Sequence, residues 1–337
     1  MRRGIAILLI AIPWFSACAM RGRVDVDDLM QEYAVAGSPG ASLLVIRDGR
    51  TVVRKGYGLA NLEEQTAAAP STNYRLASVT KQFTAASILF LAHDGKLSLD
   101  DPIRKWLPTL PDGITIRHLL THTSGLVDYE DVMPEGTTTQ VHDIDVLHLL
   151  EQNPQTYFVP GTSYRYSNSG YALLALIVER ASGQTFASFL RDRIFQPLGM
   201  KDSVAFEEGV STVPHRAYGY SRTAGGWTRT DQSTTSAVLG DGGIYASIDD
   251  LAKWDAALYT DERLRPAFEP ATATNDPTIR YGFGWRITDD SLWHTGETRG
   301  FRNVILRYPA RKLTIVILTN RNEGEPYRIA KEIAKRF

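Results

Sequence analysis

A serine and a lysine stand three positions apart at Ser78 and Lys81, in the stretch "LASVTKQF" that opens an apolar, helix-like segment. In a helix this spacing puts both side chains on one face, one turn apart. A serine hydroxyl is a weak nucleophile unless a neighbouring group removes its proton. A lysine amine can do so once desolvation or nearby cations disfavour its charged form. The pair predicts acyl transfer to the serine, although an ordinary helix start would also explain it.

A second polar cluster, "YRYSNSGY", precedes a strongly apolar helical stretch. Tyr166 and Asn168 point to the same side if the backbone there is extended. A phenol can exchange protons with a serine or a leaving group, and an amide can hold a substrate carbonyl and a lysine. The alternative is a polar helix entry in which Asn168 or Ser169 is the N-cap.

A third stretch, "WHTGETRGF", opens the β-rich end of the chain with His294, Thr295 and Gly296. A glycine inside a strand often marks a close approach of a ligand or of another backbone segment. The N–H groups of such a strand edge can stabilise a forming oxyanion. The alternative is an ordinary turn with an exposed histidine.

These groups need a scaffold that brings distant segments together. Residues 41–61 predict a β-hairpin around Asp48-Gly49, and strand-like runs return near the C-terminus before a closing helix. Helical patterns dominate the middle of the chain. We therefore expect an α+β fold, an α/β sandwich in which both chain ends build one antiparallel sheet. Helices would cover the sheet, and a mostly helical lobe at about 97–240 would be inserted, with the site in the cleft.

The bulk composition is that of a large globular protein. The chain has 337 residues, of which 43% are apolar, and its formal net charge is −1. This length suits two domains or one large domain with an insertion. No dense run of Lys and Arg occurs, so we expect no nucleic-acid partner, because phosphate binding needs clustered cations.

Two further features of the sequence have the composition of binding motifs. His118 and His122 have the i, i+4 spacing of metal ligands, but "HLLTH" lacks the glutamate of the zinc-protease motif. We expect both to be packed or capping histidines. The glycine-rich "GDGG" at 240–243 is expected to form a tight turn near the cleft. No metal and no cofactor are predicted.

The N-terminus predicts a targeting signal. Arg2 and Arg3 precede an apolar run that is short for a membrane span, and "SAC" ends at Cys18, the only cysteine. We expect a signal peptide at 1–18, lipidation of Cys18, a short linker at 19–24 and a catalytic domain at 25–337. The protein would then sit on the periplasmic side of a bacterial envelope, attached to the membrane only through the lipid. The alternative is an ordinary secretory signal.

The three motifs "SVTK", "YSN" and "HTG", in this order, resemble those of the serine β-lactamase and penicillin-binding-protein superfamily. The most similar branch comprises class C β-lactamases, D-alanyl-D-alanine carboxypeptidases and related esterases. "LLTHTSGL", "IFQPLGM" and "GDGGIYASIDDLAKW" look like that branch as well, so the resemblance covers about residues 25–337. It implies the β-lactamase/transpeptidase-like fold.

The resemblance also implies roles for the residues of the motifs. Ser78 would be the acylated nucleophile, and Lys81 would assist its deprotonation. Tyr166 would act as general base and then as acid for the leaving group, with the division of base duty between Lys81 and Tyr166 left open. Asn168 would orient the substrate and Lys81.

The third motif would supply the opposite wall of the site. His294, Thr295 and Gly296 would bind substrate there. The backbone N–H groups of Ser78 and Glu297 would form the oxyanion hole.

One departure from the family pattern bears on the substrate. Typical class C β-lactamases have Lys where this chain has His294, and an unperturbed imidazole is mostly neutral at pH 7. Glu297 adds negative charge close by. We therefore expect weak β-lactam turnover and a serine hydrolase that cleaves an ester, an amide or a D-amino-acid peptide through an acyl-enzyme. The alternative function is a non-catalytic lipoprotein that binds a small-molecule ligand or a partner; the oligomeric state stays open.

Overall fold

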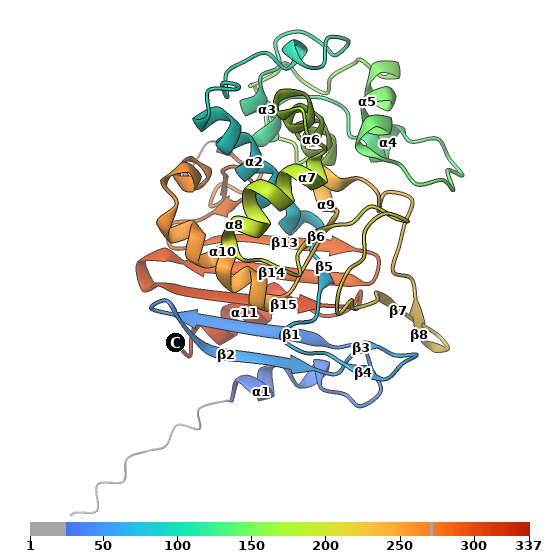
Figure 1. Ribbon diagram of the computed structural model, residues 1–337, viewed down its shortest axis with the longest axis vertical. Helices are drawn as coiled ribbons and strands as arrows, with labels where there is room; N and C mark the ends of the chain where they lie inside the picture. The colour runs from blue at the N-terminus through green and yellow to red at the C-terminus, as the bar shows by residue number, and fades with distance from the viewer. Residues whose placement is uncertain (1–24, 270–271) are drawn as a thin grey trace, which may run out of the picture.

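The structure is a computed structural model that describes residues 25–269 and 272–337 (Figure 1). The predicted signal peptide at 1–18, its lipidation site Cys18 and the linker at 19–24 lie outside the described residues. The largest element is an eight-stranded sheet. Its strands are β1 (Ala41–Arg47), β2 (Arg50–Tyr57), β10 (Thr272–Ala273), β11 (Arg280–Tyr281), β12 (Arg286–Ile287), β13 (Leu292–Thr298), β14 (Phe301–Tyr308) and β15 (Leu313–Thr319).

Both ends of the chain build this sheet, as predicted. The strand order is β10-β11-β12-β13-β14-β15-β1-β2, and each neighbouring pair is antiparallel. The N-terminal hairpin joins the C-terminal strands where β1 pairs with β15, with Ala41 opposite Thr319. The antiparallel α+β fold is therefore confirmed.

The central strands β1, β14 and β15 are buried on both faces, whereas the edge strand β2 is mostly exposed, and side chains that alternate along a central strand enter two different cores. In β1, Leu44 and Ile46 enter one apolar core, whereas Leu43 and Val45 enter the other. The first core contains α2 (Lys81–His93) and α10 (Ile248–Thr260), where the rings of Phe83 and Trp254 stack 4.4 Å apart. The second core is closed by α11 (Pro326–Ala334). This packing makes α2 a central helix, with nearly every residue buried.

The remaining helices surround α2, and those within residues 116–182 lie on its side away from the sheet (Figure 1). The remaining helices are α3 (Ile116–Leu120), α4 (Tyr129–Val132), α5 (Asp143–Gln152), α6 (Asn168–Ser182), α7 (Phe186–Leu190), α8 (Gln196–Leu198) and α9 (Leu239–Gly242), and α1 (Val26–Leu29) packs near α11. Small sheets join β3 (Leu59–Asn61) to β4 (Thr66–Ala67), β9 (Ile244–Ala246) to β5 (Tyr74–Arg75) and β6 (Val204–Ala205), and β7 (Tyr220–Thr223) to β8 (Gly226–Arg229).

The stretch 97–240 thus holds most of these helices, but it also carries β6 and the β7–β8 hairpin, which the sequence did not indicate. Within the described residues, no helix combines the length and apolarity needed to cross a membrane. The Ser247 hydroxyl accepts the N–H of Asp250 and so caps α10.

One strand-like run is interrupted where it meets the helix that begins at Lys81. "RYGFGWRI" forms two short strands, β11 and β12, rather than one. Gly284 lies between them with φ +77°, and a Cβ there would sit 2.8 Å from the carbonyl oxygen of Lys81. The bend lets this edge of the sheet pass directly over the start of α2.

Candidate active site

Ser78 lies in η2 (Ala77–Thr80), a single 3-10 turn that leads into α2. The residue before it, Ala77, has φ +49°, a left-handed conformation that costs a non-glycine residue of the order of 1 kcal/mol. This turn is packed against β13, because a Cβ at Gly296 would lie only 2.0 Å from the carbonyl oxygen of Leu76. The strand and the turn therefore hold Ser78 at the edge of the sheet.

Lys81 lies one turn further on, fully buried at the start of α2. Its Nζ is 3.1 Å from the Ser78 hydroxyl, 2.8 Å from the Asn168 amide oxygen and 3.1 Å from the backbone oxygen of Asp241. Two of these partners are carbonyl oxygens, which can only accept hydrogen bonds. Ser78 is therefore the one partner of the three that can give a proton to this nitrogen.

Tyr166 and Asn168 come from the chain that enters α6. Ser167 is the N-cap and Asn168 the first helical residue, so the sequence-based choice of Asn168 or Ser169 as the cap was wrong. The ring of Tyr166 lies 5.0 Å from Lys81 Nζ. The structure thus brings together Ser78, Lys81, Tyr166 and Asn168, as the sequence predicted, over a separation of nearly ninety positions.

Three residues that the sequence analysis missed complete a ring of hydrogen bonds around Lys81. The amide nitrogen of Asn168 donates to Glu130 at 3.2 Å, and the Tyr129 hydroxyl lies 3.4 Å from the same oxygen of Glu130. That hydroxyl is also 3.1 Å from the carboxyl group of Asp241, whose backbone oxygen accepts from Lys81. Only the position of "GDGG" near the cleft gave a signal in the sequence.

The short helix α9, which carries Asp241, is held in place by hydrogen bonds to Asp143 of α5. Asp143 is buried and accepts the backbone N–H groups of Leu239 at 2.9 Å and Gly240 at 3.0 Å. Burial raises the pKa of Asp143 to about 7 and that of Asp241 to about 8. At neutral pH the Asp241 carboxyl group is therefore mostly protonated, and it stands near Lys81 without a full opposing charge.

His294 was predicted to line the substrate cleft, but its imidazole is buried beside Tyr166 instead. Its Nδ1 lies 2.6 Å from the backbone oxygen of Thr295, so this nitrogen carries the hydrogen. Its Nε2 then accepts from the Tyr281 hydroxyl at 3.0 Å. Burial, with the charges of Arg286 and Lys81, lowers the pKa of His294 to about 3, so the ring is neutral.

Arg286 supplies a cation near this part of the site and was also missed in the sequence. Its guanidinium lies 5.7 Å from the ring of Tyr166. Thr295 is half-buried next to His294, and the backbone of Gly296 forms the contact with Leu76 described above.

A small cavity of about 50 Å³ opens directly at Ser78. Glu297, predicted to offer its N–H group to the oxyanion, lines this cavity together with Ser78. Its other walls include Arg75, Tyr129, Glu130, Asn168, Asp241 and Gly242. The cavity is thus polar, and its walls carry three carboxyl groups and one guanidinium group.

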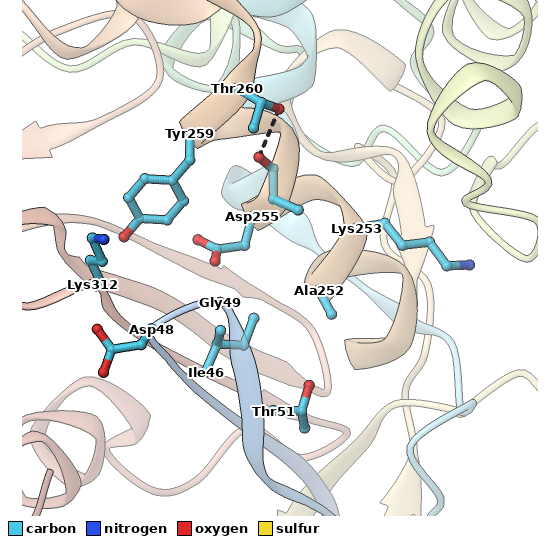
Figure 2. Close-up of a pocket in the computed structure, with 11 residues that line it drawn as sticks. Ile46, Asp48, Gly49, Thr51, Ala252, Lys253, Asp255, Tyr259, Thr260 and Lys312 are labelled. Atoms are coloured by element: carbon cyan, nitrogen blue, oxygen red, sulfur yellow. Dashed lines mark hydrogen bonds between the residues drawn. The ribbon is translucent and has the colours of Figure 1, made fainter.

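A larger cavity of about 540 Å³ lies elsewhere, between α10 and the β1–β2 hairpin (Figure 2). Asp255 points into it from α10. The carboxylate of Asp255 also accepts a hydrogen bond from Nε of Arg307 at 2.7 Å. This cavity shares no residue with the one at Ser78. Within the described residues no group of three or more His, Cys, Asp and Glu residues is arranged to hold a metal ion.

The comparison with known families agrees with this geometry. Residues 26–336 match the family model described as Beta-lactamase. The chain belongs to the Beta-lactamase family. This family member is 32% identical over 311 residues to penicillin-binding protein 4* of Bacillus subtilis, a match that covers 85% of this chain and 69% of that protein.

Two further relatives support the assignment. D-aminopeptidase of Gluconobacter oxydans is 31% identical over 295 residues, which is 84% of this chain but only 56% of the relative. The penicillin-binding protein of Bacillus halodurans superimposes with a TM-score of 0.81 at 28% identity, and the match covers 93% of this chain and 99% of that structure. This Beta-lactamase family member is a serine hydrolase.

Proposed function

We propose that Ser78 is the nucleophile of this hydrolase and that Lys81 takes its proton. This proposal rests on the three contacts of Lys81 Nζ, which are with the Ser78 hydroxyl, the Asn168 amide oxygen and the backbone oxygen of Asp241. A neutral amine has two hydrogens, which the carbonyl oxygens of Asn168 and Asp241 would accept. Its lone pair would then face the Ser78 hydroxyl, which is the arrangement that a general base requires.

Acylation follows from this arrangement. The Ser78 oxygen attacks the substrate carbonyl carbon as its proton moves to Lys81, and the N–H groups of Ser78 and Glu297 stabilise the oxyanion. As the bond to the leaving group breaks, Tyr166 donates a proton to the leaving nitrogen or oxygen and regains one from Lys81. Water then hydrolyses the acyl-Ser78 ester and restores the free enzyme.

For the substrate we propose a peptide, amide or ester of an amino acid whose amino group is free. Glu130 lines the cavity at Ser78, where its carboxyl oxygens can accept hydrogen bonds from an ammonium group. Glu297 adds a second carboxylate to the same cavity. The name of the D-aminopeptidase relative supports a substrate in which this amino acid has the D configuration.

The predicted leader at 1–18 supports a location in the bacterial envelope, with the membrane reached only through a lipid on Cys18. D-amino-acid peptides of the cell wall are available there as substrates. Mass spectrometry of the protein purified from its native membrane tests this proposal. A mature N-terminus at Cys18 with added diacylglycerol is expected, and an unmodified N-terminus elsewhere would contradict it.

Activity is tested with a panel of D- and L-aminoacyl p-nitroanilides, short acyl esters and D-Ala-D-Ala peptides. Ser78→Ala should abolish turnover and also the mass adduct formed with a fluorophosphonate. Glu130→Gln should raise KM at least about tenfold more for substrates with a free amine than for the same substrates N-acetylated, because the altered contacts with Asn168 and Tyr129 affect both sets alike. Glu208→Gln, at an exposed position, is the matched control.

Two outcomes would contradict the proposal. Retention of the adduct in Ser78→Ala would exclude this serine as the nucleophile. No turnover and no adduct with any acylating probe would favour a protein that only binds a ligand or a partner.

A further inference from the structure

The loop that follows α3 runs alongside the chain that leads to Tyr166. The N–H of Tyr157 donates to the carbonyl of Gly125 at 2.7 Å, and the N–H of Gly161 donates to that of Thr123 at 2.8 Å. The last of these contacts joins Arg165 to His122, N–H to carbonyl, at 3.0 Å. These hydrogen bonds with the loop therefore fix the path of the backbone up to the residue before Tyr166.

The side chain of His122 continues this contact past Tyr166. Its Nδ1 accepts the backbone N–H of Ser167 at 3.2 Å, so His122 binds the residues on both sides of Tyr166. Its ring also packs on the Tyr166 ring, with centroids 4.3 Å apart. One residue thus contacts the backbone before Tyr166, the backbone after it and the phenol ring itself.

The conformation and protonation of His122 fit this role. Its φ is +59°, a left-handed value that histidine adopts more readily than most residues and that turns the ring toward Tyr166. Burial, with the charges of Lys81 and Arg286, keeps the pKa of His122 well below its usual value. The ring is therefore neutral, as acceptance of the Ser167 N–H requires, and its hydrogen is on Nε2.

Tyr166 depends on such support. Over residues 25–269 and 272–337, no side chain or backbone group forms a hydrogen bond with its hydroxyl, so packing alone sets the direction of the phenol. Besides His122, the rings nearest to it are those of Tyr281 at 6.2 Å and His294 at 6.1 Å. His122 is thus the ring in closest contact with the phenol among these aromatic neighbours.

We propose that His122 is the positioning residue for Tyr166, which holds the phenol where it can pass a proton between Lys81 and the leaving group. The inference rests on the proposed role of Tyr166. His122 itself does not touch the substrate or the reacting atoms. A misplacement of the phenol by about 1 Å would be enough to lower the rate on the order of 10²-fold.

Two substitutions separate the contacts that His122 makes. His122→Asn tolerates the left-handed backbone and places its Oδ1 where the Nδ1 now accepts from Ser167, but it removes the ring that packs on Tyr166. His122→Phe keeps a ring but loses the acceptor. The matched control is His118→Asn, four residues earlier, where the imidazole accepts only the N–H of Thr115 at 3.3 Å.

The deciding experiment is a double-mutant cycle on kcat/KM with an aminoacyl p-nitroanilide, using His122→Asn, Tyr166→Phe and both together. We expect His122→Asn to cost about tenfold in the wild type and less than about twofold when Tyr166 is already Phe. His118→Asn should cost less than about twofold in either background. The thermal midpoints of all variants establish that each is folded.

Losses that multiply in full in the double variant would overturn the inference, because His122 would then act independently of Tyr166. A His122→Asn variant with wild-type kcat/KM would overturn it as well. If Tyr166→Phe alone keeps wild-type activity while Ser78→Ala is inactive, the proposed role of Tyr166 fails and the nucleophile assignment stands. The two failures are therefore distinguishable.

Discussion

Gly296 of β13 lies against the carbonyl oxygen of Leu76 so closely that a Cβ at position 296 would be 2.0 Å from it. Leu76 is two residues before Ser78, so this backbone contact joins the third motif to the first. No side chain can be placed between the two segments. The contact leads to the first of four predictions.

Gly296→Ala should destabilise the protein and misplace Ser78 together. Because the clash is with backbone, the strand or the 3-10 turn must move, at a cost of about 1–3 kcal/mol. We expect that loss in the free energy of urea unfolding and a fall in kcat/KM of at least tenfold. Gly225→Ala is the control, since a Cβ there meets only the Thr223 hydroxyl at 3.9 Å. Equal free energies of unfolding for the two variants would show that the contact between Gly296 and Leu76 does not limit the size of residue 296.

Lys81→Arg should keep the positive charge and lose the chemistry. A guanidinium stays protonated at any working pH, so it cannot accept the proton of Ser78. We expect kcat/KM to fall at least about 10²-fold, with acyl-enzyme no longer detectable by intact mass on the usual time scale. Lys96→Arg, on the exposed turn after α2, should retain wild-type activity. A Lys81→Arg enzyme with a tenth of the wild-type rate would contradict a base role for Lys81.

His294 should make the stability depend on pH in a defined direction. Burial lowers its pKa from 6.5 to about 3, so between these values the unfolded chain binds a proton that the native protein does not. Its contribution to the free energy of unfolding is complete above about pH 7 and is lost as the pH falls. Asp143 and Asp241, whose pKa values are raised, contribute in the opposite direction, which is why a difference between variants is needed.

The measurement is urea unfolding of the wild type and of His294→Asn at pH 7 and pH 5.5. The wild type should lose about 1 kcal/mol relative to the variant over this interval. His148→Asn, at an exposed position of α5, serves as the control and should show no comparable change. A difference between wild type and His294→Asn that is the same at both pH values would mean that His294 titrates normally.

Cephalosporin turnover should be weak. The neutral imidazole of His294 offers no charge to a substrate carboxylate, and Glu297 in the cavity at Ser78 repels one. We expect kcat/KM for a chromogenic cephalosporin well below about 10⁶ M⁻¹s⁻¹. Arg286, near Tyr166, is one cation that could still attract the carboxylate, so Arg286→Met should lower the residual turnover further. A value in the range of efficient enzymes would refute the argument from His294.

The sequence by itself determined the fold class and predicted the residues that we propose to be the main reactive groups. The hairpin at 41–61, the helix after Ser78 and the final strands depend on local periodicity, which a single sequence displays directly. Ser78, Lys81, Tyr166 and Asn168 were predicted because their motifs are short and ordered along the chain.

Only the tertiary structure decided which distant groups surround them. Glu130, Tyr129 and Asp241 reach Lys81 through contacts across as many as 160 positions, and no local pattern encodes such a distance. Burial decided the state of His294, since desolvation depends on every segment packed around the ring. The fold also places His122, which was expected only to pack or cap, in contact with the ring of Tyr166 and with the backbone that follows it. Residue types can be read directly from the sequence, whereas the neighbours of each side chain and its exposure to water are set only when the chain folds.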